Sequence, residues 1–322
     1  MKIIPISKEN HSDWSYVGLT HYMHTKNDAI VPILIAEIDR ISKQTTWNGF
    51  NIMDGTFSSK QFQLGANANE DVTVSVDSVA SASIGNYTVN GEAPVYTGAA
   101  DTIAAHTLTV SGYLGSSAVS VAANADAYTA AASINSVTAT TGVTATAITK
   151  AKLGAMSATG TVTFNIGSAT GSSEAAISVA VTDVSDLRGV RDAINAVAGT
   201  TGITAKMSTT NADVILTHAG GKDIVISDFL VGTAATTMTL TGLDKDEAAT
   251  TSSGGSAITL QSSAGANAFD DAFVNGHLSL NSHKTFTVTD SDTTTEQSFF
   301  DTGGTLTSSL SAISAINIGT AA

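Results

Sequence analysis

The chain has 322 residues, of which only 13% are charged, and its formal net charge is −14 at pH 7. This length can form two or three domains with cores of their own, and the acidic balance leaves no basic surface for nucleic acid. No cysteine is present. Disulfides, thiolate metal sites and a thiol nucleophile are therefore excluded together.

Residues 1–33 are rich in aromatic and histidine side chains and lack the continuous apolar core of a signal peptide. His11, His21 and His24 could be drawn as a metal site, but no glutamate completes an H-E-x-x-H pattern, so we favour a polar surface. The order of the following residues resembles the start of SapC-family proteins: Pro5, His11, Trp14, Asn27, Val31, Pro32.

Residues 34–44 are predicted to form an amphipathic helix. Leu34, Ile38 and Ile41 recur at helical spacing and give one apolar stripe. Asn48 and Gly49 follow two threonines and should end the helix, because both residues tolerate left-handed backbone. Asp54–Gly55 is a second turn signal. The alternation of valines over residues 72–76 predicts a half-buried strand.

This part of the chain resembles the passage of bacterial flagellins in which the long inner helix ends and a β-turn region begins. The family pattern L-x-A-E-I-D-R-I-x-x-Q-T-x-F-N-G, followed by D-G and F-Q-x-G-A-N, is met with Trp47 in place of phenylalanine. The resemblance implies a structural filament subunit. It also implies an assembly or structural role for Leu34, Ile38, Ile41, Gln44, Asn48, Gly49, Asp54 and Gly55.

An internal repeat follows. The segment Ile134–Ala145 recurs as Ile194–Ala205, 60 residues later, with eight of 12 positions identical. Around the second copy, alternating apolar residues predict strands near 162–166 and 177–181, a helix over 187–197, and strands over 203–207 and 213–217. Asp183 or Ser185 should cap this helix, Asp186 should favour its start, and Gly199 and Gly202 should end it.

We therefore predict an α+β, β-rich fold with a duplicated strand–strand–helix–strand–strand unit. This unit resembles the hook IN motif of flagellins and hook-associated proteins. The resemblance implies that Ile134 and Ile194 anchor the helices, and that Asn135 and Asn195 hold the turn beyond them. A plain α+β repeat without an assigned role fits the same residues.

At the end of the chain, Leu306, Leu310, Ile313 and Ile316 return to helical spacing and predict the start of a helix, where flagellins re-enter their inner domain. The resulting division is a non-flagellin segment (1–33), an inner-domain remnant (34–75), a first repeat (76–160), a second repeat (161–250), returning strands (251–304) and a truncated C-terminal helix (305–322).

No motif in the chain indicates catalysis. Asp290, Asp292 and Glu296 suggest a calcium loop, but the central glycine of such loops is missing, so we favour a solvated hairpin. Serine is abundant, yet no G-x-S-x-G motif occurs. We expect no catalytic residue, no metal and no cofactor.

The leading hypothesis is a truncated, flagellin-like structural protein of the extracellular filament, which serves motility by self-assembly and is not an enzyme. The resemblance implies other flagellin subunits, an export chaperone and an innate immune receptor as partners. We expect this chain alone not to polymerise, because the helices that would bury its apolar stripe are missing from it. The alternative is a surface module that binds glycans or host molecules, for which the exposed aromatic candidates are Tyr87, Tyr96, Tyr113 and Tyr128.

Overall fold

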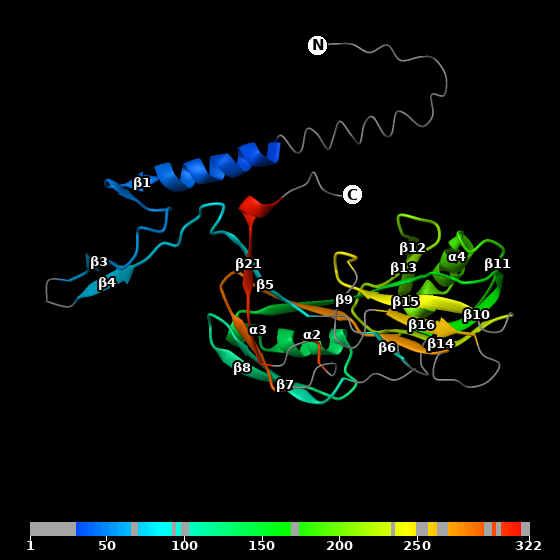
Figure 1. The fold of residues 1–322 in the computed structure, drawn as a ribbon. Helices are drawn as coiled ribbons and strands as arrows, with labels where there is room; N and C mark the ends of the chain where they lie inside the picture. The colour runs from blue at the N-terminus through cyan, green and yellow to red at the C-terminus, as the bar shows by residue number, and fades with distance from the viewer. Residues whose placement is uncertain are drawn as a thin grey trace, which may run out of the picture. The chain divides into compact units, whose positions relative to one another are not determined.

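The computed structural model describes residues 30–65, 70–91, 95–97, 103–168, 174–232, 236–248, 257–262, 270–292, 298–300 and 304–316. The chain divides into a smaller unit, made of residues up to Asn86 and from Leu310 onward, and a larger unit, Tyr87–Ser309 (Figure 1). The expectations for residues 1–29, Ala66, Asn67 and Glu296 fall outside the described residues. The predicted β-rich α+β class is confirmed.

The smaller unit begins with a helix over residues 30–44 and continues through two hairpins. In the first, β1 (Thr46–Trp47) pairs with β2 (Phe50–Asn51), with Trp47 opposite Phe50. Asn48 and Gly49 connect them at φ 49° and 80°. Asn-Gly is the pair that a two-residue hairpin turn of this hand favours, so the predicted helix stop is also a hairpin signal.

The second hairpin corrects one expectation. β3 (Lys60–Gln63) pairs with β4 (Asp71–Val74), so the strand predicted from the valines forms. Its side chains are not half-buried, because Val72 and Val74 remain 41% and 37% exposed. β3 and β4 form a two-stranded sheet of their own, and alternation along one strand does not supply the second layer that would bury its valines.

The larger unit contains most of the strands and four helical segments. Its helices are α2 (Ala127–Ser136), α3 (Thr138–Thr141), α4 (Arg188–Ala196) and α5 (Ala198–Thr201). Its strands are β5 (Gly85–Asn90), β6 (Val95–Thr97), β7 (His106–Ser111), β8 (Ser116–Val121), β9 (Thr144–Gly154), β10 (Gly160–Gly167), β11 (Ala175–Val181), β12 (Ile203–Met207), β13 (Val214–His218), β14 (Ile224–Val231), β15 (Thr237–Leu243), β16 (Ala257–Gln261), β17 (Ala272–Val274), β18 (His277–Ser282), β19 (Thr287–Asp290) and β20 (Gly304–Thr307).

These strands form three sheets. One has the order β11-β10-β14-β17-β6 and another has the order β20-β19-β7-β8. The third has the order β12-β13-β9-β18-β5-β21, where β21 is Ser309–Ala312. In this sheet β15 also pairs with β9, and β16 pairs with β15. The long strand β9 is shared, because Thr144–Ile148 pair with β18 while residues 149–154 pair with β13 and β15.

Two hydrophobic cores follow from this arrangement. The first gathers around α2 and includes Leu108, Val110, Ile134, Leu278 and Leu280. The second gathers around α4 and includes Phe164, Ile166, Ile194, Leu216 and Phe229. α2 packs on β8, β9 and β18, whereas α4 packs on β11, β12 and β13 (Figure 1).

The second repeat is inserted inside the first. In the second repeat, β12 pairs with β13, which follows it directly, and β10 pairs with β14. In the first repeat the corresponding partners are distant in sequence, because β9 pairs with β18 and β7 pairs with β19. The first repeat is therefore interrupted after β9. The segment β10 to β17 is inserted there, and β18 and β19 complete the sheets of the first repeat.

The helix expected over residues 305–316 is wrong. This segment forms β20, then β21 (Ser309–Ala312), and then a short 3-10 turn at Ile313–Ala315. Burial alternates strictly along residues 304–312, with the even-numbered positions turned inward. That period of two competes with the 3.6-residue spacing of Leu306 and Leu310, and the threonine- and serine-rich sequence favours strand.

The last of these residues return to the smaller unit. Ile313 N donates to Ile84 O at 3.0 Å and Ser314 N donates to Ser81 O at 3.0 Å. A methyl group on Gly85 would stand 2.1 Å from Ser311 O, so glycine permits the close approach of these two backbones. The beginning and the end of the described chain thus meet in one small unit.

Candidate functional site

The isoleucines of the repeat occupy the last turn of each helix. Ile134 in α2 and Ile194 in α4 are both fully buried, at 0% exposure. Burying an isoleucine side chain contributes about 1.5–3 kcal/mol, so each anchors its helix to the sheet below. Ile134 belongs to the first core and Ile194 to the second.

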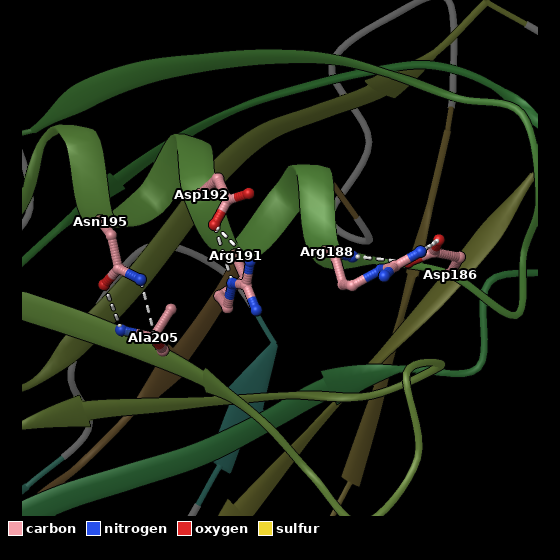
Figure 2. A network of polar contacts seen from close by, with 6 residues as sticks. All are labelled: Asp186, Arg188, Arg191, Asp192, Asn195 and Ala205. Atoms are coloured by element: carbon pink, nitrogen blue, oxygen red, sulfur yellow. Dashed lines mark hydrogen bonds and ion pairs between the residues drawn. The ribbon is translucent and has the colours of Figure 1, made fainter. Parts of the chain in front are cut away.

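The asparagines beside them make the same pair of hydrogen bonds in both repeats. Asn135 Nδ2 donates to Ala145 O, and Ala145 N donates to Asn135 Oδ1, both at 2.8 Å. Asn195 makes both bonds to Ala205, also at 2.8 Å (Figure 2). We call this arrangement the Asn clamp. It fixes the end of each helix to the strand that follows, as a side-chain amide can because it both donates and accepts.

The turn inside each clamp is also the same. Thr141 Oγ1 donates to Val137 O at 3.1 Å, and Thr201 Oγ1 donates to Val197 O at 3.2 Å. Gly142 and Gly202 then follow α3 and α5 at φ 73°. Glycine adopts this left-handed backbone with the least strain, so both repeats turn back at the same point.

The two helices begin differently. Asp126 caps α2, because its Oδ1 accepts from Thr129 N at 2.7 Å. The expected caps of α4 are wrong: Asp183 Oδ1 accepts from Ser185 N instead, and Leu187 stands at the cap position without a side-chain bond. Gly199, expected to stop this helix, lies inside α5, and Gly202 supplies the stop.

Asp186 lies at the start of α4, as expected, and pairs with Arg188 (Figure 2). Its Oδ1 accepts from Arg188 Nε at 2.8 Å and from Arg188 N at 3.2 Å. These bonds, the side-chain bond first, lower the pKa of Asp186 to about 2. The ion pair is exposed, so it orients the helix start rather than stabilising the fold by much.

A further ionic contact joins the two repeats. Glu247, at φ 67°, accepts from Lys206 Nζ at 2.6 Å and from Lys150 Nζ at 3.0 Å. Lys150 lies on β9 of the first repeat and Lys206 on β12 of the second. The bond from Lys206, followed by the bond from Lys150, lowers the pKa of Glu247. Sequence spacing gave no signal for this contact.

In the smaller unit, the predicted turn residues form a local network. Asp54 Oδ1 accepts from Thr56 Oγ1 at 2.6 Å and from Thr56 N at 2.9 Å, and Asp54 Oδ2 accepts from Asn51 Nδ2 at 3.0 Å. The bonds from Thr56 are the main reason that the pKa of Asp54 is lowered. Gly55 has φ 87°, which suits the turn. Gln44 Oε1 accepts from Arg40 at 2.7 Å.

Two residues of this helix were missed from the sequence. Ser42 is fully buried and its Oγ donates to Met53 O at 2.8 Å. Asp39 Oδ1 accepts from Ser81 N at 2.8 Å, which lowers the pKa of Asp39. Ser42 stands four residues after Ile38, on the face that the apolar spacing had already marked as inward.

The apolar stripe of the helix is mostly uncovered among the described residues. Leu34 is 56% exposed and Ile41 is 43% exposed, while Ile38 is half-buried. Ile30 and Ile33 are exposed on the preceding turn. A group of large apolar side chains of this kind marks an interaction surface more often than a free one.

The remaining candidates do not converge. Tyr128 stands in the first turn of α2, whereas the ring of Tyr113 lies against Gly142, after α3. These two exposed tyrosines therefore flank opposite ends of the helical segment. Tyr87 packs against the first core, and the side chain of Tyr96 lies outside the description. The solvated hairpin expected at Asp290 is wrong for this residue, because Asp290 is buried and accepts hydrogen bonds from Ser298 Oγ and Asp292 N.

Comparison with known proteins assigns the repeats to a family. The flagellin hook IN motif matches residues 107–159 and residues 161–220. A flagellin-type protein of Bacillus subtilis, YvzB, is 43% identical over 58 residues, which are 18% of this chain and 36% of that protein. Flagellin A of Helicobacter felis is 39% identical over 67 residues, 18% of this chain and 13% of that protein. The chain is a flagellin-like protein with two hook IN motifs.

These matches cover well under two thirds of each relative. Among solved structures, FliC from Burkholderia pseudomallei is similar at 25% identity, covering 32% of the flagellin-like chain and 42% of FliC, with a TM-score of 0.21. No described helix of the flagellin-like protein has the length and apolar character that crossing a membrane requires.

Proposed function

We propose that this flagellin-like protein is a structural subunit of the extracellular bacterial flagellar filament and acts by packing against other subunits rather than by catalysis. The two hook IN motifs carry this proposal, because they tie the larger unit to flagellins. The Ile–Asn pairs would keep that unit rigid. The export chaperone and the innate immune receptor remain proposals that rest on family resemblance.

The assembly surface that we propose is the exposed apolar face of the helix over residues 30–44. Ile30, Leu34 and Ile41 recur at intervals of four and seven residues, so they lie on one face. Each is more than 40% exposed. Covering a large aliphatic side chain contributes about 1.5–3 kcal/mol, so a helix from a neighbouring subunit would gain stability by packing here.

Co-assembly tests this proposal. A labelled chain is mixed with the flagellin monomers of the bacterium that encodes it, and its entry into filaments is followed by electron microscopy. We expect the wild-type chain to enter filaments and the double variant Leu34→Glu, Ile41→Glu to stay out. The control, Lys43→Glu, changes the charge of an exposed position on the same helix without touching the apolar face.

Two outcomes would contradict the proposal. One is that the wild-type chain never enters the filaments. The other is that the double variant enters as well as the Lys43→Glu control, which would show that the apolar face makes no contact.

A further inference from the structure

The two hook IN repeats meet at one turn, which we call the inter-repeat joint. The turn after β13 presents Gly221, Lys222 and Asp223 from the second repeat to the first. Tyr128 N donates to Gly221 O at 3.0 Å, and Thr149 Oγ1 donates to Lys222 O at 2.6 Å. Gly276 N donates to Asp223 Oδ1 at 3.3 Å. Three bonds thus link the turn to α2, to β9 and to the chain entering β18.

Two glycines bring the backbones of the joint into direct contact. A methyl group on Gly221, at φ 77°, would stand 2.2 Å from Ala147 Cβ. One on Gly276 would stand 2.6 Å from Gly221 O and 2.7 Å from Ala127 Cβ. Because backbone meets backbone, a small displacement of the turn breaks several contacts together. A displaced turn would therefore lose its contacts with Ala147 and Gly276 together.

His218 holds the turn in place. Lys222 N donates to His218 Nδ1 at 3.3 Å, and Gly221 N donates to His218 O at 3.1 Å. Nδ1 accepts a bond here, so it carries no proton, and an imidazolium ring could not replace it. The neutral ring thereby positions the two carbonyls, of Gly221 and Lys222, that bind the first repeat.

The surroundings of His218 favour the neutral ring. Burial lowers the pKa of His218, the Lys222 ammonium lowers it further, and the Asp126 carboxylate at the start of α2 opposes them. The two neighbouring strands place uncharged residues opposite His218, which are Ile203 on β12 and Thr149 on β9.

We propose that the inter-repeat joint is an acid-sensitive coupling, in which protonation of His218 opens the turn and breaks its three hydrogen bonds to the first repeat, while the shared strand β9 keeps both repeats in one sheet. The sign follows from linkage: a histidine whose pKa is lowered in the folded protein contributes stability above its ordinary pKa, and that contribution is lost as the pH falls. The coupling is thus complete above the ordinary value of 6.5 and weakens below it. This device goes beyond the filament role and stands whether or not that role is correct.

A second histidine offers a competing source of acid sensitivity. His277 follows Gly276 and is buried. Burial lowers its pKa, the charges of Asp244 and Asp246 oppose this, and the charge of Lys245 adds to it. Its Nε2 contacts Ser279 Oγ at 3.1 Å, and its Nδ1 has no partner among the described residues. It lies on β18, however, and makes none of the three bonds of the joint. The experiment must therefore separate the two rings.

Hydrogen exchange of the full chain at pH 7.5 and pH 5.5, corrected for the intrinsic exchange rate at each pH, provides the test. We expect the amides of Tyr128 and Lys222 to lose protection at pH 5.5, by up to about tenfold, because a released imidazole of ordinary pKa is about ten times more often protonated than neutral there. The amides of β7, β8, β10 and β11 should keep their protection.

Variants assign the effect. His218→Asn keeps an acceptor oxygen near the Nδ1 position and does not titrate, so its joint should hold equal protection at both pH values. His277→Asn and the control His283→Asn should show the wild-type loss. Gly221→Ala should show low protection of Tyr128 already at pH 7.5, which tests the joint without changing a titrating group.

Three results would overturn the proposal. They are a loss in His218→Asn equal to that of the wild type, an acid response abolished by His277→Asn alone, and equal losses in the joint and in the core strands. Undiminished protection in Gly221→Ala would show in the same way that the joint does not couple the repeats.

Discussion

The two hook IN repeats share their local chemistry and differ in how the chain supplies it. Both Asn clamps have the same 2.8 Å bonds, and the short helices α3 and α5 both end at a glycine with φ 73°. The strand that completes the clamp sheet comes from the next hairpin in the second repeat, where Ala205 lies opposite Leu216. In the first it comes from beyond the whole insertion, where Ala145 lies opposite Leu280.

This difference shows that the motif depends on where its strands lie in space and not on their order along the chain. Closing a flexible connection of about 130 residues instead of about six would cost roughly 3 kcal/mol more. The inserted repeat reduces that cost, because β10 and β17 both pair with β14 and so bring the two ends of the insertion to one strand.

The largest expected effect is a difference in folding between fragments that contain one repeat each. A fragment of residues 144–276 contains β9 to β17 and the entire second core, so we expect one cooperative unfolding transition by circular dichroism. A fragment of residues 103–159 contains the whole first helix and its clamp, but it lacks β18 and β19. We expect it to be unfolded. Cooperative unfolding of the shorter fragment would show that the first repeat folds without β18 and β19, so the two repeats would not differ in this respect.

A smaller effect is expected when each Asn clamp is removed and the loss of unfolding free energy is compared. Asn135→Ala should cost about 2 kcal/mol of unfolding free energy and Asn195→Ala about 1 kcal/mol, because a buried group left without its hydrogen bond costs more than an accessible one. Ala145 is buried, whereas Ala205 is only partly buried. Urea unfolding measures both, with Thr209→Ala, at an exposed position between β12 and β13, as the control. The reverse order would show that the closing strand, and not burial, sets the strength of the clamp.

The smallest effect concerns the helix starts. Arg188→Ala should return the pKa of Asp186 from about 2 toward the ordinary 3.8. Carbon-13 NMR titration of the carboxyl group measures this change. The lowered pKa contributes stability above about 3.8 that is lost as the pH falls toward 2. Arg191→Ala, the matched control, should change the pKa less, because Arg191 is the smallest contributor. If the pKa of Asp186 is unchanged in Arg188→Ala, the ion pair does not lower it and does not distinguish the start of α4 from that of α2.

The sequence predicted local features of these repeats well and long-range ones poorly. Strict alternation placed β10 and β11, and helical spacing placed α4, because one buried face imposes one period. The pairing of β18 with β9 could not be predicted, since nothing in His277–Ser282 indicates its partner strand. The same limit explains the tail, where the spacing of Leu306 and Leu310 fits both a helix and a strand. Pairing of β20 with β19 and of β21 with β5 selects the strand.

The candidate residues show the same division. The Ile–Asn pairs could be named from a repeat of 12 residues, and their bonds are local, ten positions apart. Gly221, Gly276 and Glu247 could not, because each matters only through a residue brought from far along the chain. Ser42 is an intermediate case. The sequence predicted the helical face on which it lies, but not its hydrogen bond to Met53 O.

The shared strand β9 also constrains how the protein is made. A ribosome adds about 5–20 residues per second, so β18 emerges roughly ten seconds after the part of β9 that it must pair with. During that interval the second repeat can complete itself on residues 149–154, while residues 144–148 present an unsatisfied strand edge to any passing chain. The topology thus favours an inside-out order of maturation, in which the inserted repeat can be finished before the repeat that contains it.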